Sequence, residues 1–390
     1  MENFYQIHES LISNSRGIIQ RELLNEIDWS KRLIGIKGFR GVGKTTFLID
    51  FIRAHHAEDK TCLYVNLNDF YFTRRKIISF ADEFHKRGGK VLVLDQLHKY
   101  PEWSHELREC YDQLSDLKIV FSSSPVLRIK EGNDELKEIA HIYHLEGLSF
   151  REYLNYRTGN NFPRISFNDI IDGHEEIARD VSLKVKPLAF FNEYLKNGYY
   201  PYFLENNDFY NDNLLKHINM ALEIDVTYLN QIELQYLPKL RKLLYTIASQ
   251  VPFKPNVSQL STEIETSRAT IMNYLRYLKN ARLINLVYSN GDEEEMKKPE
   301  KVFLQNSNLI YSVNPGNVNT RNLRQSFFVN QVGYQNQIKN SKVGDFKVNG
   351  QYDVTVGGKY TRSKEGYAAA DRIETGSDKT IPLWLFGFLY

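Results

Sequence analysis

The stretch GFRGVGKT, residues 38–45, decides the fold of this chain because it fits the pattern G-x-x-x-x-G-K-[ST] in full. The apolar run RLIGIK at 32–37 precedes it and predicts a buried parallel strand, and TTFLIDFIRAH at 45–55 predicts a helix. Glycines let main-chain N–H groups surround a phosphate, and the start of a helix adds its positive dipole end. The sequence therefore predicts a nucleotide-binding loop formed by Gly38, Arg40, Gly41, Val42, Gly43, Lys44, Thr45 and Thr46.

Three side chains are predicted to act on the phosphates and on Mg²⁺. Lys44 is expected to reach the β- and γ-phosphates, and the Thr45 hydroxyl is expected to bind Mg²⁺. The apolar run KVLVL at 90–94 ends in Asp95. A carboxylate at the C-terminal tip of a neighbouring strand would orient Mg²⁺ through its water shell, so ATP and Mg²⁺ are the predicted cofactors.

Further strands are predicted at 61–66, 117–121 and 142–146, alternating with helices up to about residue 150. This alternation predicts an α/β domain with a parallel sheet. The strand at 117–121 runs into Ser122, Ser123 and Ser124, whose hydroxyls would either detect the γ-phosphate or form a turn before Pro125. We expect Ser124 to belong to the site. Residues 1–29 predict a helix that either packs on the sheet edge or borders the adenine.

Composition sets broad limits on the class of protein. A length of 390 residues predicts two to three domains, and 42% hydrophobic with 25% charged residues is ordinary for a globular chain. The net charge of +2 neither favours nor excludes nucleic acid as a partner. Cys62 and Cys110 fit no metal spacing and are expected to be packing residues. With no signal-like N-terminus and no apolar run long enough to span a bilayer, we expect a cytoplasmic protein without a membrane partner.

The sequence resembles prokaryotic AAA+-like ATPases of the Bacteroidetes and archaeal type, which carry a C-terminal restriction-endonuclease-like domain of unknown function. The resemblance rests on GFRGVGKTT, VLVLDQLHKYPEW, LKIVFSSS and HLEGLSFREYL, then on FNEYLKNGYYPYF, RQSFFVNQV, GDFKV, VGGK and the terminal IPLWLFGFLY. It implies an ATPase domain at 1–150, a helical lid or connector at 151–235, a winged-helix domain at 236–299 and a nuclease-like α+β domain at 300–390.

The resemblance also shows where acidic residues have been replaced. ATPases of this type usually have Glu after the Walker B Asp, where Gln96 stands here. Glutamine can orient the attacking water but is a very poor base, so slow hydrolysis is expected. The two nuclease-like positions that would hold Glu are occupied by Gln325 and Thr355, through natural divergence or deliberate change.

A winged-helix outline is predicted over residues 236–290. An apolar stripe at 240–247, a short helix at 257–264 and a third helix from Ser267 to Asn280 precede the strand LINLVY at 283–288. The third helix would expose Arg268, Asn273 and Arg276 to DNA, although such modules also pack against a neighbour instead.

The C-terminal segment is predicted to contain strands at 302–304 and 309–311, a helix at 321–332, and a hairpin of 345–348 with 352–356 across Asn349-Gly350. Resemblance to a nuclease core implies a metal site, of which Asp345 and Lys359 remain. One carboxylate holds a catalytic Mg²⁺ poorly, so we expect a pseudo-nuclease and keep active nuclease as an alternative.

The leading hypothesis is an ATP-binding, Mg²⁺-dependent AAA+-like switch, with DNA as a candidate partner. The alternative is an interaction scaffold that holds ATP without hydrolysing it. Arg151 in LSFREYL is expected either to contact a γ-phosphate, to act as an inter-subunit arginine, or to form a helix salt bridge.

Overall fold

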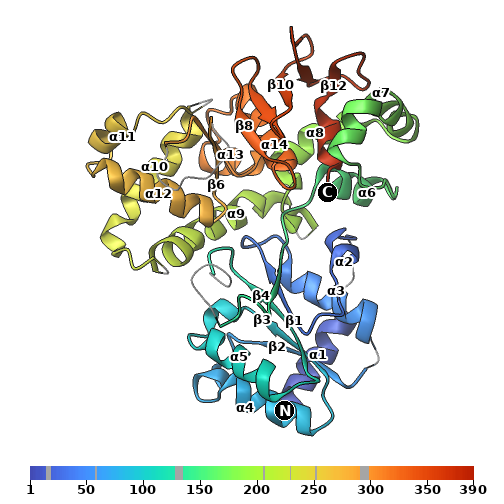
Figure 1. The fold of residues 1–390 in the computed structure, drawn as a ribbon, viewed down its shortest axis with the longest axis vertical. Helices are drawn as coiled ribbons and strands as arrows, with labels where there is room; N and C mark the ends of the chain where they lie inside the picture. The colour runs from blue at the N-terminus through green and yellow to red at the C-terminus, as the bar shows by residue number, and fades with distance from the viewer. Residues whose placement is uncertain are drawn as a thin grey trace. The chain divides into compact units, whose positions relative to one another are not determined.

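The computed structural model describes residues 1–14, 19–57, 59–127, 135–204, 207–228, 230–250, 253–289 and 298–390. The chain forms two compact units, Met1–Gly147 and Leu148–Tyr390 (Figure 1). Most of the charged stretch GDEEEMKKPE at 291–300, near the end of the predicted winged-helix domain, lies outside the described residues. No helix among the described residues is long and apolar enough to cross a bilayer.

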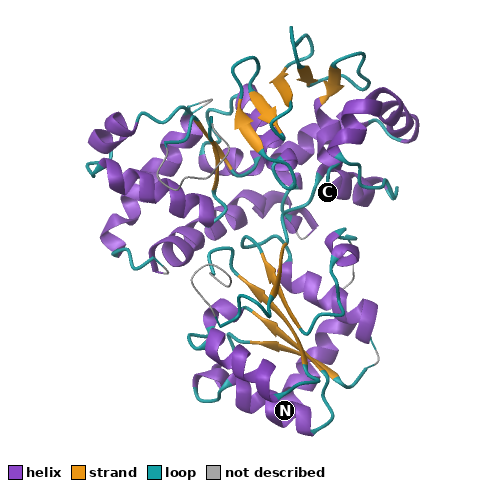
Figure 2. Cartoon of the chain, in the orientation of Figure 1, coloured by secondary structure: helices purple, strands orange, loops and turns teal. Residues whose placement is uncertain are grey.

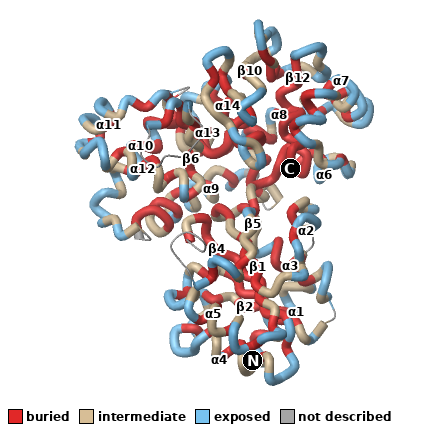
Figure 3. Tube along the Cα trace, in the orientation of Figure 1, coloured by how far each residue is buried: buried red, intermediate tan, exposed pale blue. Residues whose placement is uncertain are grey.

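The first unit is built on a five-stranded parallel sheet in the order β2-β3-β4-β1-β5. All five strands are where the sequence predicts them, and nearly all of their residues are buried or partly buried (Figure 3). The strands are β1 Leu33–Lys37, β2 Cys62–Asn66, β3 Val91–Asp95, β4 Lys118–Ser123 and β5 His141–His144.

Helices cover both faces of this sheet (Figure 2). Apolar side chains of the strands point alternately to α3 on one face and to α4 and α5 on the other. The helices are α1 Glu2–Asn14, α2 Leu23–Glu26, α3 Lys44–His56, α4 Ile77–Lys86 and α5 Trp103–Gln113, with short 3₁₀ turns η1 Phe70–Thr73 and η2 Leu97–Lys99.

Helix α1 closes the β2 edge of the sheet. The main-chain N–H of Tyr64 in β2 donates to Nδ1 of His8 at 2.9 Å, and burial lowers the pKa of that imidazole, which keeps it a neutral acceptor. Phe4 packs edge-on to Phe80 with ring centroids 5.1 Å apart. Residues 1–29 are predicted to form one helix that either packs on the sheet edge or borders the adenine. Residues 2–14 form a helix on the sheet edge, and the chain leaves the helical conformation before α2 begins.

The second unit is mainly helical, with a five-stranded mixed sheet near its C-terminal end. Its helices are α6 Phe150–Thr158, α7 Phe167–Lys184, α8 Pro187–Glu193, α9 Tyr210–Met220, α10 Leu237–Ser249, α11 Val257–Glu263, α12 Arg268–Asn280, α13 Ser307–Val313 and α14 Thr320–Val332. Its strands are β6 Ile284–Val287, β7 Lys301–Leu304, β8 Ile338–Asn340, β9 Phe346–Val348, β10 Tyr352–Gly357, β11 Tyr367–Ala370 and β12 Thr380–Pro382. Short π and 3₁₀ turns complete it, at η3 Tyr194–Gly198, η4 Pro201–Leu204, η5 Asn207–Phe209, η6 Ala221–Tyr228, η7 Leu234–Tyr236 and η8 Leu383–Phe388.

The structure differs from the predicted division of residues 151–390. Helices α6, α7 and α8 contribute to one hydrophobic core with α14, the β8–β12 sheet and η8. Phe150 packs edge-on to Phe191, and Phe191 to Phe327, at centroid distances of 5.1 and 4.9 Å. The predicted connector is therefore part of the same folded body as the C-terminal segment, because its apolar side chains supply a large part of that core.

Two local predictions in this unit have different outcomes. The hairpin of β9 and β10 forms as expected, with Asn349 and Gly350 both at positive φ in its turn. Residues 309–311, predicted as a strand, belong instead to helix α13. The Asn306 side chain caps that helix by accepting from the N–H of Leu309. Asparagine before the run indicates a helix start, but the short apolar run at 309–311 is also compatible with a strand.

Candidate nucleotide-binding site

The loop between β1 and α3 adopts a conformation that only glycine tolerates well. Gly41 and Gly43 have φ values of 82° and 94°. A Cβ on Gly38 would stand 2.4 Å from the main-chain oxygen of Leu145. These three positions therefore require glycine for backbone reasons, which is what the sequence pattern predicts.

Lys44 and Thr45 begin α3 at the end of this loop. The Lys44 ammonium donates to the main-chain oxygens of Gly38 and Phe39 at 2.7 and 2.9 Å, so it folds back over the loop that would surround a phosphate. The N–H groups of the first turn of a 13-residue helix start at the same point.

Asp95 is the centre of a buried hydrogen-bond network at the tip of β3. Its Oδ2 accepts from the hydroxyls of Thr45 at 2.7 Å and Tyr64 at 2.8 Å. Its Oδ1 accepts from the Ser122 hydroxyl and from the N–H of Gln96. Burial and the neighbouring carboxylate raise the pKa of Tyr64, which therefore stays a protonated donor. Four donors fix both oxygens of a carboxylate that is 1% exposed.

The strand order corrects one part of the sequence interpretation. The sequence predicts Asp95 on a strand next to the phosphate-loop strand, but β4 lies between β3 and β1. Ser122 on β4 therefore stands between the loop and Asp95, and its Oγ also accepts from the N–H of Gln96 at 3.0 Å. Ser124, the predicted site residue, is buried with a hydroxyl that has no partner among the described residues.

Gln96 has a left-handed backbone conformation, with φ of 60°. This is uncommon for a residue with a side chain, and here the two hydrogen bonds from its N–H hold it in place. The chain then turns directly into η2, so the side chain at position 96 leaves the strand at a fixed point beside Asp95.

The residues at this edge fit a magnesium ion. Thr45 and Asp95 offer hard oxygen ligands whose atoms lie 2.7 Å apart, and the Asp95 carboxylate is held by hydroxyl and amide donors. In phosphate-loop enzymes, a hydroxyl binds the metal directly and a carboxylate acts through a metal-bound water. Among the described residues no cluster of three or more His, Cys, Asp or Glu forms another metal site.

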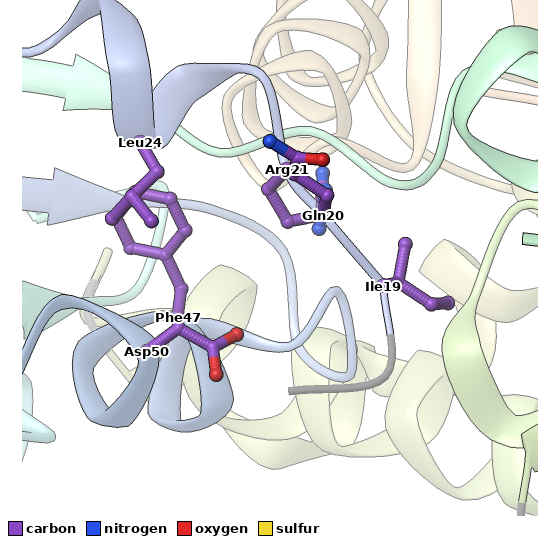
Figure 4. A pocket seen from close by; sticks show the side chains of 6 residues that line it. All are labelled: Ile19, Gln20, Arg21, Leu24, Phe47 and Asp50. Atoms are coloured by element: carbon purple, nitrogen blue, oxygen red, sulfur yellow. The ribbon is translucent and has the colours of Figure 1, made fainter. Parts of the chain in front are cut away.

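A cavity of about 190 Å³ lies beside α3 (Figure 4). Arg21 connects its wall to the phosphate loop by donating to Val42 O at 3.1 Å and to Glu146 O at 2.7 Å. Burial raises the pKa of Asp50 at its rim, although Arg53 and Arg21 oppose this. The lining mixes apolar and polar side chains: Ile19, Gln20, Arg21, Leu24, Phe47 and Asp50.

His98 in η2 is a residue of this site that the sequence analysis missed. Both nitrogens of its imidazole are buried, and neither has a hydrogen-bond partner among the described residues. Burial, then the positive charges of Arg40, Lys44 and Lys99, lower the pKa of this imidazole to about 3. The available sequence signal was its position three residues after Asp95, on the turn that leaves the strand tip.

Asp345, the remaining nuclease-like carboxylate, has two hydrogen-bond donors within the second unit. The Asp345 carboxylate accepts from Arg321 at 3.3 Å and from the N–H of Val356 at 2.9 Å, so a cation and an amide already occupy it. Lys359 is exposed, with its ammonium over the ring of Tyr360, and does not pair with Asp345. Thr355 is partly buried, and Gln325 is fully buried with neither amide atom partnered among the described residues. No helix joins β10 to β11 over the described residues 358–366.

Helix α12 presents the predicted polar side chains. Arg268 and Asn273 are exposed, and Arg276 donates to Asn273 Oδ1 at 3.2 Å while its guanidinium lies over the Tyr277 ring. Helices α10, α11 and α12 are followed by the antiparallel pair β6–β7, whose second strand lies in the segment predicted to begin the C-terminal domain.

Arg151 is buried inside the second unit. It is 4% exposed and donates to Tyr390 O at 3.1 Å and Phe162 O at 3.2 Å. Its guanidinium thus ties α6 to the last residue of the same unit, which is a packing role.

Two family models match parts of this chain. A family model described as an AAA domain matches residues 30–154, which include the phosphate loop, β3 and Asp95. A model described as a domain of unknown function, DUF8612, matches residues 189–320.

Relatives were also found among curated proteins and solved structures. An uncharacterized protein of Methanocaldococcus jannaschii is 24% identical over 292 residues, and the match spans 70% of this chain but only 60% of the relative's own length. A variant of RuvB from Thermotoga maritima is 12% identical, with a TM-score of 0.29 over 74% of this chain and 89% of that one. AMPPCP-bound DnaA from Aquifex aeolicus is 13% identical, with a TM-score of 0.27 over 71% and 87%. Structural similarity at this level carries no argument about function.

Proposed function

We propose that this chain is an ATP- and Mg²⁺-binding switch of the AAA+ type whose hydrolysis step is slow. The observation that carries the proposal is the network at the sheet edge, where Thr45, at the end of the phosphate loop, is hydrogen-bonded to the buried Asp95 carboxylate. An AAA domain over residues 30–154 supports the same assignment.

The residues of the loop and of the neighbouring strand end would each contact a different part of the nucleotide. The main-chain N–H groups from Gly41 to Thr45 would donate to phosphate oxygens, and Lys44 would exchange its two carbonyl acceptors for β- and γ-phosphate oxygens. Thr45 and Asp95 would hold Mg²⁺, which neutralises charge between the β- and γ-phosphates when it is bound. The cavity beside α3 would receive the base, with Phe47 and Leu24 supplying apolar surface.

Slow hydrolysis follows from the residue beside Asp95. Gln96 can donate to or accept from a water molecule, but its amide cannot take the proton that the water must lose. The γ-phosphate would therefore persist, and its contacts at the tips of β3 and β4 would keep the domain in the triphosphate state. A scaffold that never hydrolyses ATP is the limiting case of the same mechanism.

Calorimetric titration with ATP and Mg²⁺, followed by a phosphate-release assay, tests the proposal. Lys44→Ala should weaken ATP binding by about ten-fold or more, because a charged hydrogen-bond donor to the phosphates is lost. Lys86→Ala is the matched control, since Lys86 is exposed on α4 and pairs with Asp82. If Lys44→Ala left ATP affinity unchanged, or the native chain bound no triphosphate, the proposal would fail.

A second candidate function is DNA contact through α12. It is supported by the exposed Arg268 and Asn273 on one helix, next to Arg276, in a unit where a strand pair follows three helices. Such side chains can meet phosphates or base edges. Titration of labelled duplex at several salt concentrations tests it, because phosphate contacts make affinity fall steeply with salt.

A further inference from the structure

The turn that follows Asp95 places an imidazole beside the phosphate loop. Its main chain is fixed at both ends: the Gln96 N–H donates to Asp95 and Ser122, and the Tyr100 N–H donates to Leu97 O at 3.0 Å. The Tyr100 hydroxyl then donates to the buried Glu106 at 2.7 Å. His98 projects from the middle of this braced segment, so the position of its ring is set before any ligand binds.

The imidazole of His98 has unused hydrogen-bonding capacity. Both ring nitrogens are shielded from solvent, and neither has a partner among the described residues. A neutral imidazole carries one donor and one acceptor, and leaving such groups buried without partners is unfavourable. A buried group of this kind in a native structure requires an explanation, and a ligand that binds beside it is one.

The surroundings indicate what that partner is. Arg40 and Lys44, the two cations of the phosphate loop, act electrostatically on His98, and burial together with these charges keeps its pKa far below the ordinary value. The ring is therefore a neutral N–H donor in a cluster of positive charge. An anion with several acceptor oxygens would satisfy the imidazole and the cations together.

We propose that the His98 imidazole donates a hydrogen bond to the terminal phosphate of a bound nucleoside triphosphate and so distinguishes triphosphate from diphosphate. This inference rests on the proposed nucleotide site and adds a residue to it. The β-phosphate is expected deeper in the loop at Lys44, whereas η2 leaves the sheet at the Asp95 and Ser122 edge where the γ-phosphate is expected. Formation of this hydrogen bond would then couple the presence of the γ-phosphate to the position of the segment between β3 and α5.

The test compares affinities for a non-hydrolysable ATP analogue and for ADP, each with Mg²⁺, by calorimetry. His98→Leu should weaken binding of the analogue by about ten-fold or more and change ADP affinity less than about two-fold, because only the triphosphate loses a hydrogen-bond donor to a charged acceptor. His98→Gln retains an N–H donor and should recover part of the affinity. His105→Gln, at an exposed histidine on α5, is the matched control.

A spectroscopic readout separates this role from a packing role. In ¹⁵N-labelled protein, the His98 ring signals, assigned from their loss in His98→Gln, should shift on addition of the analogue and not of ADP. Equal effects of His98→Leu on both nucleotides, or unshifted ring signals at saturating analogue, would overturn the inference. The proposed function would still stand if Lys44→Ala weakened ATP binding as expected. If no nucleotide binds the native chain, the proposed function itself fails. His98→Gln keeps the measurement available should His98→Leu not fold.

Discussion

Two glutamines on helix α14 lead to opposite predictions for stability. Gln325 and Gln331 lie on one helix, and both are fully buried. Neither amide atom of Gln325 has a partner among the described residues. The amide nitrogen of Gln331 lies 3.2 Å from the Tyr194 hydroxyl, 3.0 Å from the Tyr390 hydroxyl and 2.7 Å from Asn330 Oδ1.

The expected changes in the free energy of unfolding follow from this contrast in hydrogen bonding. Gln325→Met keeps a side chain of similar length and removes a buried donor and acceptor that cost about 1–3 kcal/mol each when unpaired. Part of that gain is offset by repacking, which costs under about 1.5 kcal/mol for a swap of conserved volume. We expect the free energy of unfolding to rise by about 1–3 kcal/mol. Gln331→Met should instead lower it by about 2–4 kcal/mol, because it removes the amide N–H donor to Asn330 Oδ1 and to two buried hydroxyls.

Denaturant unfolding followed by tryptophan fluorescence measures both changes. The chain has 3 Trp, and Trp384 is buried in the core that contains α14, whereas Trp29 and Trp103 belong to the first unit. A background of Trp29→Phe and Trp103→Phe therefore reports the second unit alone. If Gln325→Met destabilised this unit as much as Gln331→Met, the Gln325 amide would have a binding partner and the reasoning would be refuted.

Three further predictions concern the proposed activities. Gln96→Glu should raise the rate of ATP hydrolysis by at least about ten-fold by restoring a general base, as measured by phosphate release, and an unchanged rate would show that the base is not what limits turnover. Because folding lowers the pKa of His98 from 6.5 to about 3, the unfolded chain takes up the proton first as pH falls. The first unit should therefore lose stability as pH drops from about 6.5 toward 3, by up to about 1.4 kcal/mol per pH unit, and His98→Gln should flatten that part of a thermal-unfolding pH profile. Arg268→Ala should weaken duplex binding uniformly across sequences and reduce the salt slope by about one, and a slope equal to that of the native chain would argue against DNA contact by α12.

The local signals in the sequence were sufficient to locate the five strands and helix α3 of the first unit. The buried strands are continuous apolar runs, and the phosphate loop shows its glycines because positive φ and close backbone approach demand them at Gly41, Gly43 and Gly38. Periodicity likewise located α12 and α14 to within a residue or two. It failed at 309–311, where a short apolar run is compatible with either strand or helix.

The sequence by itself determined which residues stand at the carboxyl ends of the strands, because each strand ends where its apolar run ends. Only the tertiary structure decided which of those ends meet. Placing β4 between β1 and β3 brings Ser122, rather than Ser124, to Asp95, and it leaves the imidazole of His98 beside the loop cations. Strand order and the joining of α6–α8 to the C-terminal core arise from long-range packing of apolar faces, which a local pattern of residues does not encode.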